Sequence, residues 1–171
     1  MSSLERFLDP ETTSLKICGV TFPDDAKNLI SHDVDALGVN FWPQSKRHLP
    51  WEDAHWLRDL KGKILRVGVF VNQSVLPAEL FSQDLIDVVQ LHGDESVEEA
   101  AIYRDHGIPF IKAFGVNTFA DLKHAPDYGA SAVLLDAPAP GTYGGTGETF
   151  DWNHALAFNR EHPDRPISLA G

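Results

Sequence analysis

The feature that most constrains the fold is a repeat of short apolar runs separated by charged segments of helical character. Seven such runs are present, at residues 15–18, 36–41, 65–71, 87–91, 110–113, 132–135 and 167–170. Most are continuously apolar, which is typical of parallel strands covered on both faces. Helices are expected between them, at residues 23–31, 51–60, 77–81, 96–106, 119–124 and 152–160. The runs recur about every 25 residues, the spacing of a βα unit, and so predict an α/β fold with a parallel sheet.

Right-handed βα units at this spacing form either a closed (β/α)8 barrel or an open doubly wound sheet. No Gly-x-Gly-x-x-Gly follows the first run, and the glycine-rich segment Gly144-Gly145-Thr146-Gly147 lacks the Lys-Ser/Thr of a P-loop. Both observations disfavour a nucleotide-binding sheet. A whole barrel needs about 200 residues or more, whereas the seventh run meets residue 171. We therefore expect one domain over residues 1–171: a (β/α)8 TIM barrel incomplete at its C-terminus, lacking the last helix, strand and helix.

Composition narrows the partners and the compartment. The chain has 14 Lys and Arg against 25 Asp and Glu, a net charge of −11 that argues against nucleic acid and anionic membranes, because both need a basic face. No apolar run approaches the roughly 20 residues of a membrane helix, and no apolar signal core opens the chain. We expect a cytoplasmic protein. The single cysteine, Cys18, excludes an internal disulfide framework and a cysteine-rich zinc site, and the histidines show no metal-ligand spacing.

Polar residues follow several of the runs, where the catalytic face of a barrel lies. Cys18 ends the first run, Arg47 follows the second, His92 follows the fourth and Asp136 follows the sixth. Each of the four residues has a simpler interpretation without a catalytic role. The thiol is a small buried group, the cation lies in a solvated loop, the imidazole is hydrogen-bonded in the core, and the carboxylate caps a turn. Lys112 lies inside the fifth run and therefore needs an anionic partner or a route to solvent. The pattern predicts a thiol, an imidazole, a carboxylate and cations on one rim.

Six collinear stretches between residues 15 and 171 carry a family resemblance. They are Lys16-Ile17-Cys18-Gly19-Val20-Thr21, Ser45-Lys46-Arg47, Arg66-Val67-Gly68-Val69-Phe70-Val71-Asn72, Val89-Gln90-Leu91-His92-Gly93, Leu134-Leu135-Asp136, and Gly144-Gly145-Thr146-Gly147 with Thr149-Phe150-Asp151-Trp152. Together they resemble phosphoribosylanthranilate isomerase of tryptophan biosynthesis. The resemblance implies the Amadori rearrangement of N-(5-phosphoribosyl)anthranilate to 1-(2-carboxyphenylamino)-1-deoxyribulose 5-phosphate, with no metal or organic cofactor.

The resemblance also implies a role for each site residue. Cys18 becomes the general base that removes the C2 proton, and Asp136 the general acid that opens the furanose ring. Arg47 grips the anthranilate carboxylate, for which a planar bidentate fork is suited. His92 becomes a pocket wall or an orienting donor. Gly171 stands where the family's phosphate-binding glycine pair begins.

Two other functions stay open from the sequence. One is a catalytically inactive barrel fragment or interaction module that keeps the residues without the activity. The other is a different phosphosugar isomerase or epimerase. The combination of Cys18, Arg47 and Asp136 disfavours this second alternative. A small-molecule substrate is expected in the first-ranked interpretation. A homo-oligomer, or fusion to a neighbouring tryptophan-pathway enzyme, is also expected.

Overall fold

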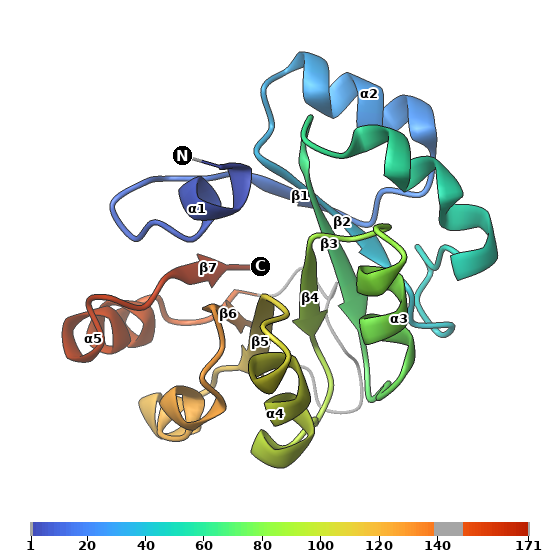
Figure 1. Ribbon diagram of the computed structural model, residues 1–171. Coiled ribbons are helices and arrows are strands. Elements are labelled where there is room, and N and C mark those ends of the chain that lie inside the picture. Colours follow the sequence, from blue (N-terminus) through green and yellow to red (C-terminus); the bar gives the residue numbers. More distant parts are fainter. Residues whose placement is uncertain (1, 139–148, 171) are drawn as a thin grey trace.

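A computed structural model describes residues 2–138 and 149–170 of the chain (Figure 1). Its sheet consists of seven parallel strands in chain order: β1 (Lys16–Cys18), β2 (Ala36–Asn40), β3 (Leu65–Phe70), β4 (Val88–Leu91), β5 (Phe110–Gly115), β6 (Ala132–Asp136) and β7 (Ile167–Leu169). Every predicted run overlaps one of these strands, and β5 and β6 extend past the C-terminal ends of their runs. The chain order of the sheet is that of a (β/α) barrel and not of a doubly wound sheet, so the predicted fold class is confirmed.

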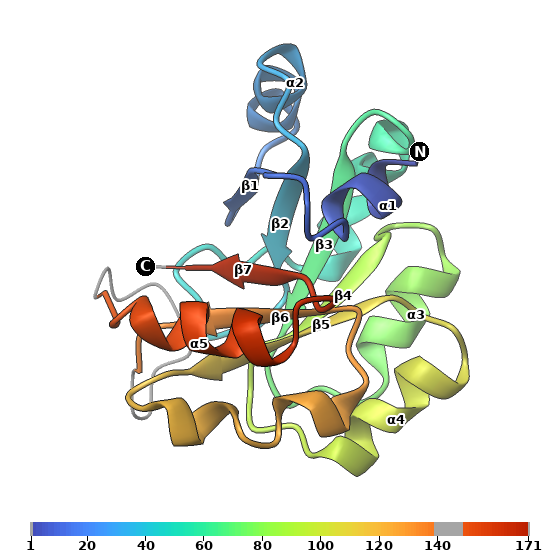
Figure 2. The same cartoon turned by 90° about the vertical axis from the view of Figure 1, so that its left-hand side faces the viewer.

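Helical segments cover the outside of the sheet (Figures 1 and 2). The α-helices are α1 (Ser3–Phe7), α2 (Pro23–Ser31), α3 (Leu76–Ser82), α4 (Val97–Asp105) and α5 (Asn153–Glu161), and the 3-10 helices are η1 (Trp51–Leu60), η2 (Phe119–Leu122) and η3 (Ala125–Tyr128). All six predicted helices are present. Within the described ranges, none is long and apolar enough to cross a membrane.

Four segments differ from the prediction, and one of them is η2, a 3-10 helix that ends at Leu122 rather than at residue 124. Segment η1 is a 3-10 helix, and its buried residues Ala54, Leu57 and Leu60 recur every third position, which aligns them on one face at three residues per turn. The short helix α1 was not predicted, although Ser2 and Glu5 form the reciprocal hydrogen bonds of a capping box at its start. Segment η3 was also missed and ends at a left-handed glycine, Gly129.

The inner face of the sheet encloses an apolar core of its own. Strands β2 to β6 and helix α1 supply buried residues to one cluster: Phe7, Ala36, Leu65, Val67, Val88, Ile111, Ala113, Ala132 and Leu134. Side chains from five strands meet in one cluster only if the sheet curves around them. The alternate residues of the same strands pack outward against the helices, so each strand is covered on both faces.

The barrel is open between its first and last strands. In the described ranges each strand pairs with its sequence neighbour, and no pairing joins β7 to β1. A groove of about 570 Å³ lies there, lined by residues of the arm that precedes β1, by Lys16 and Cys18, and by β7. The structure is therefore a seven-stranded partial barrel, as the sequence predicts.

The alkaline stability of the fold should depend on Tyr103, a buried residue of α4. Burial raises the pKa of Tyr103 to about 12, and the charges of Glu95 and Glu99 add to the effect. Between pH 10 and about 12 the unfolded chain releases this phenol proton while the folded chain keeps it, so the free energy of unfolding falls as the pH rises. Urea unfolding at several pH values should show the free energy of unfolding falling between pH 9 and 12. In Tyr103→Phe the total fall over this range should be smaller by on the order of 2 kcal/mol. An identical fall in the two proteins would contradict this assignment.

Candidate functional site

Strand register places Cys18 and Asp136 on the inner face of the barrel. Lys16 pairs with Ala36, a residue of the inner core, and Cys18 lies two positions further on, so it faces the same way. Asp136 likewise lies two positions after the core residue Leu134. Both residues end their strands, so the thiol and the carboxylate occur at the C-terminal rim of a parallel sheet.

The Asp136 carboxylate accepts one backbone hydrogen bond and lies beside the His92 imidazole. Its Oδ1 accepts a hydrogen bond from the Ala137 backbone N–H at 2.8 Å, and its Oδ2 lies 3.3 Å from His92 Nε2. Asp136 is only 9% exposed. The backbone of His92 is fixed in turn, because its N–H donates to the Phe70 carbonyl of β3 at 2.8 Å. The predicted imidazole and carboxylate therefore meet in the structure.

A residue that the sequence analysis did not single out completes this group. Gln90, in β4, has its Nε2 2.8 Å from His92 Nδ1. Gln90 in β4 thus contacts His92, which directly follows β4, and His92 contacts Asp136 at the end of β6. A polar residue within the apolar run at residues 87–91 was the available signal for Gln90.

Arg47 lies across the end of β1. Its Nη1 donates to the Cys18 carbonyl oxygen at 2.7 Å, and its side chain is exposed. Gly19 makes room for it, because a Cβ at Gly19 would lie 2.5 Å from Arg47 Cδ. Gly19 also has a φ of +87°, which glycine adopts without strain. The guanidinium therefore sits beside the cysteine, with donors left over for an anion.

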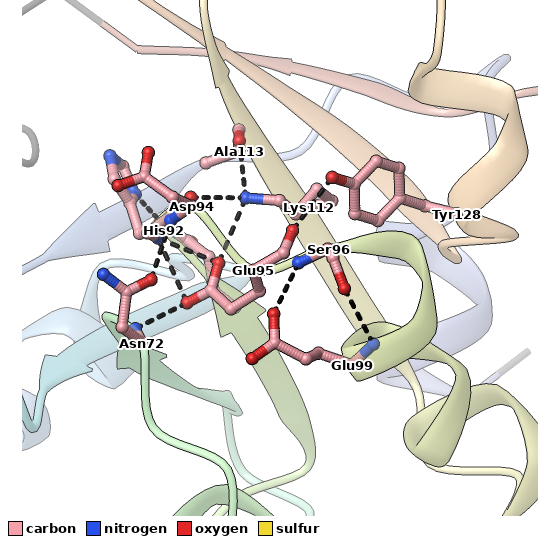
Figure 3. Close-up of polar contacts among 11 residues, drawn as sticks. Asn72, His92, Asp94, Glu95, Ser96, Glu99, Lys112, Ala113 and Tyr128 are labelled. Atoms are coloured by element: carbon pink, nitrogen blue, oxygen red, sulfur yellow. Dashed lines mark hydrogen bonds and ion pairs between the residues drawn. The ribbon is translucent and has the colours of Figure 1, made fainter.

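The prediction that Lys112 needs an anionic partner is confirmed, and its side chain points away from the barrel interior. Its neighbours in β5, Ile111 and Ala113, belong to the inner core, so Lys112 points outward beneath the helices. Its Nζ points toward Glu95 (Figure 3), whose Oε2 lies 3.1 Å away. The Nζ also donates to the Gly93 carbonyl at 2.7 Å. Burial lowers the pKa of Lys112, and the Glu95 carboxylate opposes that effect.

The Lys112–Glu95 pair fixes the loop that carries His92. Glu95 Oε2 accepts from the Gly93 backbone N–H at 3.0 Å, and Oε1 accepts from the Asn72 backbone N–H at 2.8 Å (Figure 3). Asn72 has a φ of +52°, and its Oδ1 lies where a Cβ of Gly93 would collide with it. Two strand ends are thus tied together under His92, which makes the outward ion pair a support for the inward site.

Two groups of the predicted residues remain apart in the described ranges. His92 contacts Asp136, and Arg47 contacts the backbone of Cys18, but no hydrogen bond or ion pair joins one couple to the other. Gly171 and the glycine-rich segment at residues 144–147 lie outside the described residues. No three His, Cys, Asp or Glu side chains in residues 2–138 and 149–170 are grouped to hold a metal ion.

Comparison with known sequences gives one consistent match. A family profile described as N-(5'-phosphoribosyl)anthranilate isomerase matches residues 15–171. The relative of that name from Geobacter sp. strain M21 is 39% identical over 151 residues, which is 87% of this chain and 72% of the relative. The one from Thermotoga petrophila is 38% identical over 161 residues, which is 92% of this chain and 76% of the relative.

Solved structures agree with the sequence relatives. The structure of phosphoribosyl anthranilate isomerase from Thermotoga maritima superposes with a TM-score of 0.80 and 34% identity, over 94% of this chain and 77% of that one. A second structure of that name holds reduced 1-(o-carboxyphenylamino)-1-deoxyribulose 5-phosphate. It superposes with a TM-score of 0.77 and 32% identity, over 92% of this chain and 75% of that one.

Proposed function

The chain belongs to the N-(5'-phosphoribosyl)anthranilate isomerase family, and from that premise we infer that it converts N-(5'-phosphoribosyl)anthranilate to 1-(2-carboxyphenylamino)-1-deoxyribulose 5-phosphate in tryptophan biosynthesis. The observation that carries the proposal is the placement of Asp136 and Cys18 on the inner face at the rim, within the region that matches the family. This reaction needs one acid and one base, and it needs no redox partner because the oxidation at C2 balances the reduction at C1.

We assign Asp136 as the acid. As a carboxylic acid it gives its proton to the furanose ring oxygen, the bond between C1 and that oxygen breaks, and the amine lone pair forms the C1–N double bond. The Ala137 N–H donates to Asp136 Oδ1, and His92 Nε2 lies 3.3 Å from Oδ2. Both groups then stabilise the carboxylate that forms.

Cys18 is assigned as the base. Its thiolate removes the proton from C2, the electron pair forms a C1–C2 double bond, and the iminium nitrogen regains its lone pair. The resulting enolamine becomes the ketone when the C2 hydroxyl loses its proton and C1 gains one. Lys16 faces inward with Cys18, and the Arg47 guanidinium donates to the Cys18 carbonyl, so two cationic side chains flank the proposed base.

Arg47 is proposed to bind the anthranilate carboxylate, and this assignment predicts a change in KM. Arg47→Ala should raise KM by about 10- to 100-fold, the equivalent of one charged hydrogen bond. Arg47→Lys should recover little, because a point charge does not reproduce the bidentate fork. Lys46→Ala, at the exposed neighbouring position, is the matched control. If steady-state kinetics show an unchanged KM for Arg47→Ala, Arg47 does not bind the substrate and is only a solvated cation in a loop.

Three further features of this account rest on the family alone. Gly171 is proposed to contact the substrate phosphate through its backbone N–H. The location is proposed to be cytoplasmic. A homo-oligomer is also proposed; one Thermotoga maritima structure describes monomers generated from a dimeric relative, 31% identical to this chain over 92% of its length.

A further inference from the structure

Gln90 has an unusual position for an amide side chain. It pairs with Val69 of β3 and Ile111 of β5 in the sheet register, and Ile111 belongs to the inner core, so Gln90 points into the barrel. It is 1% exposed. Its Nε2 is paired with His92, but its Oε1 has no hydrogen-bond partner among the described residues. A buried acceptor without a partner is costly, so the orientation of this amide needs an explanation.

The amide orientation dictates the tautomer of His92. An amide nitrogen only donates, so His92 Nδ1, 2.8 Å away, must accept. A neutral imidazole that accepts at Nδ1 carries its proton on Nε2. His92 Nε2 lies 3.3 Å from Asp136 Oδ2, so a proton there is next to the carboxylate. A proton on Nδ1 would instead set one N–H against another.

We propose that Gln90 is a positioning residue that locks His92 as a hydrogen-bond donor to Asp136. The proposal rests on the proposed function, in which Asp136 is the acid. When the Asp136 O–H bond breaks and its proton moves to the ring oxygen, negative charge develops on the carboxylate. A donor already fixed beside that carboxylate stabilises the charge without reorganising. Keeping the amide nitrogen toward His92 leaves Oε1 without a partner among residues 2–138 and 149–170.

The residue type at this position follows from the same argument. Glutamate has nearly the same shape but only accepts, so it would draw a proton to Nδ1 of His92. Methionine fills a similar volume without any donor, so it would leave the tautomer undecided. A neutral donor of this length is what the lock requires.

The direct test is nitrogen NMR of the imidazoles in ligand-free protein labelled with 15N-histidine, because it distinguishes a protonated ring nitrogen from one that carries a lone pair. The His92 signals are assigned from their loss in His92→Gln. We expect protonated Nε2 and unprotonated Nδ1 in the parent protein. We expect a protonated Nδ1 in Gln90→Glu, and a mixture of tautomers in Gln90→Met. The exposed Gln83 offers the matched controls Gln83→Glu and Gln83→Met, which should leave the His92 pattern unchanged.

Kinetics form the second arm. Gln90→Met should lower kcat by about 10-fold and Gln90→Glu by about 100-fold, each a part of the contribution of a positioned proton donor, with KM changed less than about twofold. A parent protein with its proton on Nδ1 would overturn the inference, as would a Gln90→Met variant that keeps both the parent tautomer and the parent kcat. A parent protein with the expected tautomer, and no turnover even when the chain is extended to the length of its relatives, would overturn the proposed function and the catalytic role of Gln90 with it.

Discussion

Replacing Asp136 with asparagine should lower kcat by about 10²- to 10⁴-fold, the usual contribution of a positioned proton donor. The amide keeps the shape of the side chain, and Oδ1 still accepts from Ala137, but no proton is available for the ring oxygen. Cys18→Ser should cost a similar factor, because a hydroxyl is a far weaker base than a thiolate. KM should change much less in both variants, since neither group is assigned a ground-state contact.

Each variant is made in a chain extended to the length of the relatives, and steady-state kinetics beside the unsubstituted extended chain measure these factors. Asp33→Asn is the matched control for the amide substitution: Asp33 is exposed, and its φ of +54° is one that asparagine also adopts. A far-UV spectrum and a melting temperature like those of the parent show that the fold is kept. An Asp136→Asn variant with near-parental turnover would remove Asp136 from the acid role.

Residues 1–171 on their own should be a poor isomerase beside a longer chain that closes the barrel. Strands β1 and β7 are not paired with each other, and the groove between them opens beside Cys18. Unpaired parallel edges favour association with other chains. The relatives are longer than this chain, which spans 72% of one and 76% of another. A chain extended by the segment that follows the matched region in the Thermotoga maritima relative, called here the completed chain, supplies the comparison.

The expected difference lies in both kinetic constants. TIM-barrel enzymes commonly bind phosphate at the loops after strands seven and eight, and binding energy from that remote group helps to hold the reacting sugar. We expect the completed chain to exceed residues 1–171 by about 10²-fold or more in kcat/KM, with a lower kcat as well as a higher KM in the short chain. Size-exclusion chromatography should show more association for the short chain. Equal turnover by the two chains would show that the phosphate is held elsewhere.

Much of the fold was predictable because a two-sided parallel sheet imposes a strong pattern. Strands β3 and β6 are buried at every residue, and their runs in the sequence are continuously apolar. Arg66 was the exception within such a run: it is fully buried, and its guanidinium binds both carboxylate oxygens of Asp87, at 2.6 and 2.9 Å. Helix α1 was not predicted because five residues carry too short a period to detect.

The sequence predicted which residues lie at the ends of the strands. It did not predict which side chains contact one another there. Position at a strand end located Cys18, His92 and Asp136 on the rim, since parallel strands all end at the same edge. Which face Lys112 occupies depends on the register of β5 with its neighbours, and the sequence does not contain that register. Gln90 was missed for the same reason: inside a run it is one polar residue, and only the pairing with β5 turns it inward toward His92.

The most direct test of the account is the loss of substrate fluorescence when N-(5'-phosphoribosyl)anthranilate is mixed with the completed chain, measured beside its Asp136→Asn variant. Both proteins must first show a folded spectrum. The account predicts turnover by the completed chain and a decrease of about 10²- to 10⁴-fold in the variant. A folded completed chain without turnover, or turnover that Asp136→Asn leaves unchanged, would contradict it.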